Sequence, residues 1–449
     1  MSRDMKDSGN EWIGLIPQDW YTIPFKHFFR TGKGLSFTKA DLVPEGNAVI
    51  SYGQIHSKLN TGTRLDANLL RYVPDSITEN GDTSKVFKGD FIFADTSEDI
   101  EGCGNCAYID KQLDVYAGYH SVIAHWKVQN DNKYYAYFFM SPYWRSQVRC
   151  RVSGIKVFSI SQSIINSTTL VVPPRDEQDR IAHHLDKVCS DIDEMIVLQE
   201  KVIEELKAYK QSIITEAVTK GLNPNVPMKN SGIDWIGEIP EHWKIEPLKY
   251  CFGRRSEKNS PIKTEERLSL SIDKGVTPYA DKTTNLDRFK DDFTQYQLAY
   301  PNDIVLNCMN MIVGAVGLSN YMGCVSPVYY VIYPSKQNIN PHYYSYLLNI
   351  PTIRGVYYSL GKGIYAIERG EGRVNTCRLK VSYNDFGRLE IPVPPVQEQK
   401  DITLYIQKKC SEIDSLIAIK QQKIEELKEY KKSVIYEYVT GKKEVPYGE

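Results

Sequence analysis

The chain has 449 residues, 41% of them hydrophobic and 25% charged, and a formal net charge of −1 at pH 7. This length suffices for two or more domains with their own cores, and the balanced charge argues against a globally basic nucleic-acid binder, so any basic surface must be local. The polar N-terminus, the absence of a run of about 18 apolar residues and the nine scattered cysteines predict a cytoplasmic protein with reduced thiols, without a signal peptide, a membrane span or a disulfide framework.

The first block of the chain is written twice. Residues 11–29 read EWIGLIPQDWYTIPFKHFF and residues 234–252 read DWIGEIPEHWKIEPLKYCF. In both copies an Ile-Pro pair lies between two tryptophans, and Trp20 and Trp243 are the second of each pair. We interpret these tryptophans as packing residues that close the start of a domain, in preference to residues that contact a ligand.

The stretch that follows the first block mixes short apolar runs with turn residues. Strands are expected at 47–55, 86–95 and 120–128, with Gly89-Asp90 as a turn. Residues 132–140 and the segment that follows Ser141-Pro142 are expected to be helical. This half of the chain is therefore predicted to be an α+β domain.

Residues 253–393 repeat this order of elements more loosely. Residues 298–307 (LAYPNDIVLN) resemble 86–95, and residues 340–348 (NPHYYSYLL) resemble 131–139. The offset between the two halves then grows, which places additional residues of the second half near 361–373. The two halves match at their starts and ends and diverge in between. This indicates that the central residues of each half are its variable part.

Each half closes with a long helix. Residues 176–220 and 397–440 contain no Pro or Gly, and at 1.5 Å per residue each gives a rod of roughly 65 Å. Residues 203–214 (IEELKAYKQSII) recur as 424–435 (IEELKEYKKSVI). Apolar residues at steps of three and four form a coiled-coil seam, and the two copies are expected to bury these seams on each other in antiparallel orientation. The predicted interface residues are Ile181, Leu185, Ile192, Ile196, Leu206, Ile213, Ile402, Ile406, Ile413, Ile417, Leu427 and Val434.

The whole chain is thus expected to be α+β, with two tandem domains separated by two long antiparallel helices in a pseudo-two-fold repeat. The predicted segments are a first domain at 11–172, a first helix at 173–222, a linker at 223–233, a second domain at 234–393 and a second helix at 394–441.

The search for catalytic motifs is mostly negative. The Gly-Lys-Gly sequences at 32–34 and 361–363 lack the spacing and the Ser or Thr of a phosphate-binding loop. Cys103 and Cys106 have metal-ligand spacing, but no second Cys or His pair follows at zinc-site distance, so we expect reduced thiols and no metal site. No catalytic residue is predicted.

The positive signal is the distribution of charge. Neither Asp nor Glu occurs between Asn132 and Arg175 or between Ile304 and Ile367, and basic residues occur in or just after both stretches. Such residues neutralise phosphates and read base edges, although a buried apolar region with incidental basic residues remains the alternative, and we favour it for 304–350. The candidate DNA-binding residues are Lys133, Arg145, Arg149, Arg151, Lys156, Arg354, Lys362, Arg369 and Arg373.

These motifs resemble the specificity subunit of type I restriction-modification enzymes. Both halves open with W-I-G-x-I-P-x-x-W and close with P-P-x-x-E-Q, at 173–178 and 394–399, directly before a long helix. The resemblance covers nearly the whole chain. It implies two target recognition domains that each read one half of a bipartite sequence in double-stranded DNA, and paired helices that set the spacing and dock two modification subunits.

The resemblance also implies that the chain itself is non-catalytic. S-adenosylmethionine, ATP and Mg are expected on the partner subunits: the modification subunits methylate adenine in a flipped-out base, and restriction subunits translocate and cleave the DNA. The family has no universal base-contacting residues, so the candidates above rest on the charge argument alone. Two readers related by a pseudo-dyad would engage half-sites roughly 34–36 Å apart.

Two other classes of function are considered. A coiled-coil adaptor with duplicated protein-binding domains would explain the repeat. However, domains whose central residues diverge while their ends match are better suited to recognising variable DNA targets. A self-sufficient DNA-modifying enzyme would need cofactor motifs that the sequence lacks.

Overall fold

The computed structural model describes residues 3–128, 132–282, 293–364, 368–369, 373–374 and 378–445, without the side chains of 364, 368, 369, 373, 374 and 378. The chain divides into two compact units. Unit 1 comprises Met1–Glu200 and Gln421–Glu449, and unit 2 comprises Lys201–Lys420. Each unit therefore holds one α+β domain together with half of each long helix.

The domain of unit 1 is built from two four-stranded sheets. One is antiparallel, in the order β10-β8-β12-β4. The other has the order β6-β5-β11-β7, and its β11 runs parallel to β5. Their strands are β4 (Phe29–Lys33), β5 (Asn47–Ile50), β6 (Arg71–Val73), β7 (Lys85–Val86), β8 (Phe91–Ala94), β10 (Cys106–Tyr108), β11 (Val115–Ala117) and β12 (Ser121–Trp126). Three two-stranded pairs complete it: β1 (Met5–Asp7) with β2 (Leu15–Pro17), β3 (Tyr21–Pro24) with β14 (Thr169–Val172), and β9 (Thr96–Ser97) with β13 (Phe158–Ser159).

The described part of this domain also contains six short α-helices. They are α1 (Phe25–Phe28), α2 (Tyr52–Ile55), α3 (Asp75–Thr78), α4 (Tyr134–Met140), α5 (Pro142–Arg149) and α6 (Gln162–Asn166). The expected helices at 132–140 and after Ser141 are confirmed as α4 and α5, and Ser141 caps α5 by accepting a hydrogen bond from the amide of Trp144. The strand expected over 47–55 is wrong in its second half, because Ser51 and Gln54 form a capping box that starts α2.

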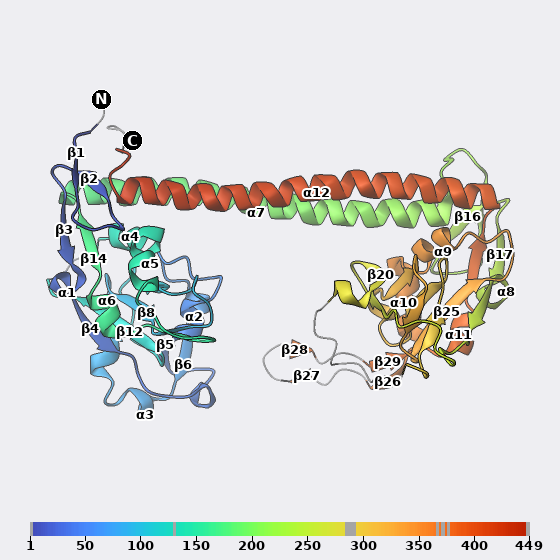
Figure 1. Cartoon of the computed structure of the whole chain (residues 1–449), viewed down its shortest axis with the longest axis horizontal. Coiled ribbons are helices and arrows are strands. Elements are labelled where there is room, and N and C mark those ends of the chain that lie inside the picture. Colours follow the sequence, from blue (N-terminus) through green and yellow to red (C-terminus); the bar gives the residue numbers. More distant parts are fainter. Residues whose placement is uncertain are drawn as a thin grey trace. The chain divides into compact units, whose positions relative to one another are not determined.

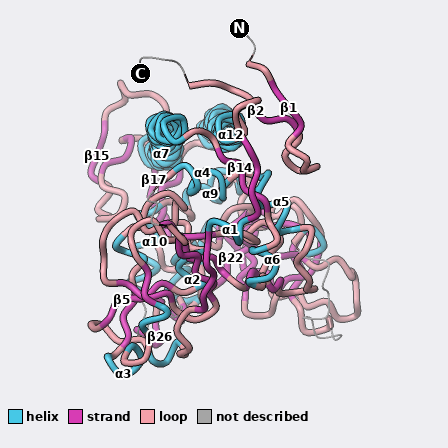
Figure 2. The backbone as a smooth tube through the Cα atoms, turned by 90° about the vertical axis from the view of Figure 1, so that its left-hand side faces the viewer, coloured by secondary structure: helices cyan, strands magenta, loops and turns pink. Residues whose placement is uncertain are grey.

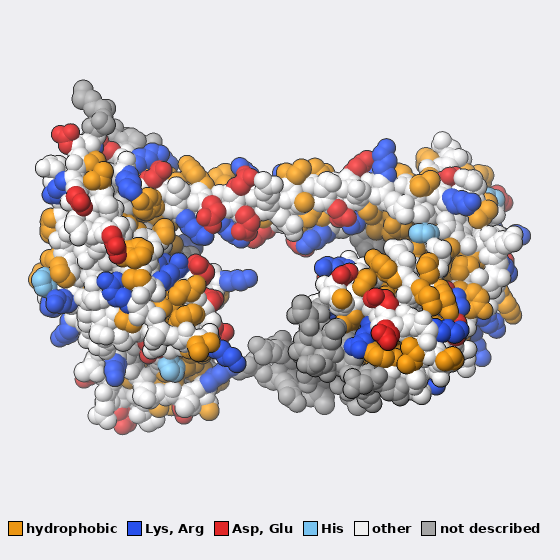
Figure 3. All heavy atoms as spheres, in the orientation of Figure 1, with side chains coloured by type: hydrophobic (Ala, Val, Ile, Leu, Met, Phe, Trp, Pro, Cys, Tyr) orange, Lys and Arg blue, Asp and Glu red, His pale blue; other side chains and the backbone are white. Residues whose placement is uncertain are grey.

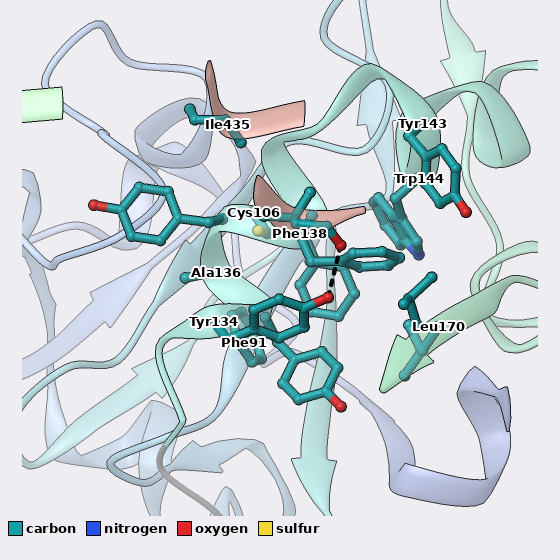
Figure 4. Close-up of a cluster of buried hydrophobic side chains, with 14 of the residues drawn as sticks. Phe91, Cys106, Tyr134, Ala136, Phe138, Tyr143, Trp144, Leu170 and Ile435 are labelled. Atoms are coloured by element: carbon teal, nitrogen blue, oxygen red, sulfur yellow. Dashed lines mark hydrogen bonds between the residues drawn. The ribbon is translucent and has the colours of Figure 1, made fainter. Parts of the chain in front are cut away.

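The core of unit 1 is strongly aromatic. Figure 4 shows Phe91, Tyr134, Phe138 and Trp144 gathered in one cluster with Ile435, which lies on the second long helix. The side chains of Phe91, Tyr134, Phe138 and Trp144 are fully buried. The domain and the far end of this helix therefore share one hydrophobic core, so neither buries its apolar surface alone.

The domain of unit 2 repeats the antiparallel four-stranded sheet of unit 1, and its other described strands form two-stranded pairs. Its four-stranded antiparallel sheet has the order β18-β25-β22-β23, with strands β18 (Phe252–Arg255), β22 (Ile304–Asn307), β23 (Val316–Leu318) and β25 (Tyr329–Pro334). Six pairs accompany it: β15 (Met228–Asn230) with β16 (Glu238–Pro240), β17 (Lys244–Pro247) with β30 (Glu390–Val393), β19 (Leu268–Ser271) with β20 (Gly275–Pro278), β21 (Gln297–Ala299) with β24 (Gly323–Val325), β26 (Lys362–Ile364) with β29 (Arg378–Lys380), and β27 (Glu368–Arg369) with β28 (Arg373–Val374). Its short helices are α8 (Leu248–Cys251), α9 (Pro341–Leu347), α10 (Pro351–Leu360) and α11 (Tyr383–Gly387).

The two long helices are α7 (Arg175–Lys220) and α12 (Val396–Val439), and they pack side by side (Figures 1 and 2). In unit 1, Lys431 Nζ lies 2.7 Å from both carboxylate oxygens of Asp193. In unit 2, Lys210 Nζ lies 2.7 Å from both carboxylate oxygens of Asp414. The two ion pairs set the same register, since Asp193 precedes Lys210 by as many residues as Asp414 precedes Lys431. The helices are therefore antiparallel, as expected. None of the helices in the described ranges combines the length and the apolar content that a bilayer span needs.

Candidate nucleic-acid interface

The first P-P-x-x-E-Q motif fastens the domain of unit 1 to α7. The indole Nε1 of Trp20 donates a 2.8 Å hydrogen bond to Oε2 of Glu177, and the guanidinium of Arg3 also binds this carboxylate. The hydrogen bond with Glu177 raises the pKa of Arg3 above its ordinary value. Gln178 Nε2 donates to the carbonyl of Pro173 at 2.7 Å. The motif thus joins the first block of the domain, which contains Trp20, to the first turn of the long helix.

The second copy of the motif does the same in unit 2. The indole Nε1 of Trp243 donates to Oε2 of Glu398 at 2.9 Å, and the ring Nε2 of His242 lies 2.7 Å from the other carboxylate oxygen. Gln399 Nε2 donates to the carbonyls of Pro394 and Asn338. Because Trp20 and Trp243 are fully buried, the packing interpretation of these two residues is confirmed.

Each domain also holds the C-terminal end of a long helix. In unit 1 the buried hydroxyl of Tyr134 donates a 2.8 Å hydrogen bond to the carbonyl of Val439, at the end of α12. In unit 2 the buried hydroxyl of Tyr343 donates a 2.7 Å hydrogen bond to the carbonyl of Val218, near the end of α7. Each domain is therefore attached to the start of one long helix and to the end of the other, so its orientation on the helix pair is fixed at two points.

Most of the predicted seam residues are buried. Ile181 and Leu185 in unit 1, and Ile402 and Ile406 in unit 2, belong to the core cluster of the adjoining domain. Val434 also belongs to the core cluster of unit 1, and the other predicted seam residues are buried or half-buried as well. Buried are Ile192, Ile213, Ile413, Leu427 and Val434, and half-buried are Ile196, Leu206 and Ile417.

Three of the candidate basic residues of unit 1 have partners within the unit. Lys133 Nζ lies 2.6 Å from Asp186 of α7. Arg149 pairs with the carboxylate of Glu101 at 3.0 Å and donates to its carbonyl at 2.7 Å. Arg145 donates to the carbonyl of Phe139, and burial lowers the pKa of its guanidinium. These residues support the fold of the domain, and Glu101 supplies the negative charge that the 132–175 stretch lacks.

Arg151 and Lys156 lie apart from these three, on the surface. Both are exposed, and the guanidinium of Arg151 donates to the carbonyl of Gln147 and to Sγ of Cys150. Arg151 precedes a hairpin, residues 153–159, that is held to the rest of the domain by the pairing of β13 with β9. Lys156 lies at the tip of this hairpin, next to Ile155.

In unit 2 the structure describes two of the four candidates fully. Arg354 donates to Oδ1 of Asn349 at 3.0 Å, and burial lowers the pKa of its guanidinium. Lys362 is exposed and lies 3.9 Å from Asp385. The side chains of Arg369 and Arg373 lie outside the described residues.

The sequence reasoning missed a surface feature of unit 1 at the β11–β12 turn. His120 adopts a left-handed conformation (φ 54°), which is uncommon for a residue with a side chain. Its ring contacts those of Tyr52 and Tyr119, and its Nδ1 lies 3.2 Å from Asp95. In the sequence, the only signal for this surface feature is the pair Tyr119-His120 directly before a strand.

The long helices carry two equivalent apolar patches on their exposed surface. Patch 1, in unit 1, consists of Met195, Leu198 and Tyr430, and patch 2, in unit 2, consists of Leu416, Ile419 and Tyr209. At 100° per residue, Met195 points away from Asp186, which contacts the domain through Tyr137 and Lys133. Met195 of patch 1 therefore lies on the face of α7 opposite to the domain. Figure 3 shows hydrophobic side chains among Lys, Arg, Asp and Glu along the helix pair.

The described part of the chain contains no group of three or more His, Cys, Asp and Glu side chains that could hold a metal ion. Its eight described cysteines are free thiols. A cavity of about 290 Å³ in unit 2 lies where α7 ends, between Leu222 and Glu398. Since Glu398 already binds Trp243 and His242, this cavity belongs to the attachment of the domain.

Comparisons with known proteins agree on one family. Residues 17–208 match the family model described as "Type I restriction modification DNA specificity domain". The chain is 24% identical over 440 residues to the MjaX specificity subunit of Methanocaldococcus jannaschii, covering 96% of this chain and 95% of that protein. It is 26% identical over 310 residues to the MjaVIII specificity subunit of the same organism, covering 66% and 67%.

Solved structures share the fold. A chain from a study of the complex assembly and conformational transition of the type I R-M system has a TM-score of 0.66 at 15% identity, covering 95% of this chain and 99% of that chain. The HsdS subunit of Thermoanaerobacter tengcongensis has a TM-score of 0.50 at 13% identity, covering 95% and 98%.

Proposed function

Because the chain belongs to the specificity subunits of type I restriction-modification enzymes, and so confers DNA specificity without being catalytic itself, we propose how its parts divide this work. The domain of unit 1 reads one half of a bipartite DNA target, and the domain of unit 2 reads the other half. The pair α7 and α12 sets the distance between the two half-sites and docks two modification subunits. Restriction subunits join that assembly.

The observation that carries this proposal is the double attachment of each domain. Trp20 and Glu177 fasten the first domain to the start of α7, and Trp243 and Glu398 fasten the second to the start of α12. Since the helices continue without interruption from Arg175 to Lys220 and from Val396 to Val439, the length of helix determines the separation of the readers. In this proposal the bases between the two half-sites are not read.

The apolar patches support the docking of modification subunits. A cluster of large apolar side chains that is exposed on a charged helix face is typical of a protein–protein interface. Patches 1 and 2 occupy equivalent positions of the repeat, so they suit two copies of one partner. S-adenosylmethionine, ATP and Mg are assigned to the partner subunits, where the methyl transfer and the cleavage take place.

Direct DNA contacts of this chain are assigned to the exposed candidates Arg151, Lys156 and Lys362. Arg145, Arg149, Lys133 and Arg354 support the fold next to them. For Arg369 and Arg373 the DNA contact stays a prediction.

The proposal is tested by mapping N6-methyladenine across a genome with and without this gene, in cells that express the modification subunits. We expect one methylated motif, composed of two half-sites and an unread spacer, that disappears with the gene. Methylation that persists without the gene, or a motif without an unread spacer, would overturn the proposal.

A further inference from the structure

The hairpin at 153–159 in unit 1 presents an apolar tip to solvent. Ile155 is 98% exposed, the highest value among the large hydrophobic side chains in the described ranges, and Val157 is 50% exposed. Exposed apolar residues are common when they occur singly, but here two flank one exposed lysine, Lys156, on a single turn.

The hairpin is a built element of the domain. Phe158 and Ser159 pair with Ser97 and Thr96 as the two strands β13 and β9. The amide of Ser159 donates to the carbonyl of Ser153 at 3.2 Å, which closes the hairpin on itself. These hydrogen bonds hold the tip in one place, so its exposure is not that of a loose tail.

Gly154 makes the turn possible. Its φ is 151°, and a Cβ at this position would lie 2.0 Å from the carbonyl oxygen of Val157. The glycine is therefore required for Ile155 to project from the turn. The sequence of the second domain repeats Gly-Ile at the equivalent place, where Gly363 has a φ of 157°. In the second domain this Gly-Ile pair lies in the strand β26, so the exposed apolar turn is described for unit 1 alone.

The charged residues of the hairpin segment itself are basic. Arg151 precedes the hairpin and Lys156 lies at its tip, and both are exposed. Acidic residues lie at both ends of the partner strand β9. Asp95, whose carboxylate interacts with His120 and Thr96, precedes it, and the exposed Glu98 and Asp99 follow it. The tip itself, residues 153–159, offers two apolar side chains and one cation, and its sequence contains no acidic residue.

We infer that this tip reads base edges: Ile155 and Val157 contact thymine methyl groups in the major groove of one half-site, while Lys156 contacts the phosphate backbone. The major groove admits a two-stranded β-ribbon, and apolar side chains distinguish thymine there by its methyl group. Lysine contacts to phosphate fix the register of such a ribbon and carry no sequence information. This inference rests on the proposed function and assigns specificity within it.

The test uses the specificity subunit assembled with its modification subunits, and a duplex library randomised over both half-sites of the wild-type motif. For the double variant Ile155→Ala and Val157→Ala we expect the preference for A·T pairs to fall about tenfold at one or two adjacent positions of one half-site, with the other half-site unchanged. Lys156→Ala should lower methylation several-fold for all sequences alike. Val128→Ala, which truncates an 80% exposed side chain two residues after β12, is the matched control and should change nothing.

Two results for the double variant would overturn the inference. One is an unchanged motif at full methylation. The other is a loss of methylation for all sequences together with loss of the modification subunits, which would make the tip a protein contact. Both leave the proposed function intact, whereas a wild-type complex that methylates without a bipartite motif contradicts the proposed function itself.

Discussion

The indole Nε1 of Trp20 donates a 2.8 Å hydrogen bond to Glu177, which lies 157 residues later in the chain. Trp243 and Glu398 repeat this contact at 2.9 Å, 155 residues apart. In both halves the residues at the two ends of a domain therefore meet at the start of a long helix. This contact gives a physical reason for the two motifs, W-I-G-x-I-P-x-x-W and P-P-x-x-E-Q, to occur together.

Removing the indole donor should destabilise unit 1. Trp20→Phe leaves the nearly buried carboxylate of Glu177 without one of its donors, and a hydrogen bond to a charged group contributes about 1.5–3 kcal/mol. We expect faster hydrogen exchange in β3 and β14 and a lower urea midpoint for unit 1. Trp12→Phe is the control. Because Trp12 is 39% exposed, its substitution should lower the free energy of unfolding by no more than about 0.5 kcal/mol. Equal effects of the two variants would contradict this role.

The ion pair between Lys431 and Asp193 should contribute little to stability. The two side chains are 20% and 50% exposed, so water screens their attraction. A double-mutant cycle with Lys431→Ala and Asp193→Ala should give a coupling free energy of about 0.2–1 kcal/mol in thermal unfolding, and the pair Lys210 and Asp414 should behave alike. A coupling above about 2 kcal/mol would show that the register depends on these charges more than on the apolar seam.

Thiol reactivity should separate the cysteines by burial. Cys150 is exposed, whereas burial raises the pKa of Cys106 to about 12 and that of Cys189 to about 11. The thiolate is the reactive form, so at pH 8 these two thiols stay protonated and iodoacetamide should modify Cys150 first. Mass spectrometry of the native chain, with the urea-unfolded chain as control, measures this order. Rapid native modification of Cys106 would contradict it.

Patch 1 should be required for binding a modification subunit. Met195→Asp with Leu198→Asp places two charges on the outer face of α7, and we expect one modification subunit fewer per complex by analytical ultracentrifugation. Val197→Asp is the control, because Val197 is 63% exposed and points to a different side of the helix. Unchanged stoichiometry in the double variant would exclude patch 1 as the docking surface.

The helices and the repeat could be predicted from the sequence because their signals are local and long. An apolar seam over some 45 residues, free of Pro and Gly, has one simple solution. The ends of α7 and α12 lie within one residue of the Pro- and Gly-free stretches 176–220 and 397–440, and within two residues of the predicted helix segments 173–222 and 394–441. The α+β class also followed from short patterns. The turn from β5 into α2 could not be predicted, because it depends on a capping box at Ser51 that competes with strand residues.

The candidate surface was harder to predict, because charge along the sequence does not show which partner lies across the fold. Arg149 appeared unpaired in a stretch without acids, yet Glu101 reaches it from a distant loop. Arg354 likewise binds Asn349. The exposure of Ile155 depends on a hairpin held by β9, so composition gave no reason to select it.

The spacing of the two half-sites tests the central claim most directly. Inserting seven residues after Glu200 and seven after Gln421, which are equivalent points of the repeat, lengthens the helix pair by about 10 Å and keeps the apolar seam in phase. The methylated motif of this variant should keep both half-sites and gain unread spacer, by no more than about three base pairs at 3.4 Å each. A motif with both half-sites and an unchanged spacer would contradict the account, because the helices would then not determine where the two domains read DNA.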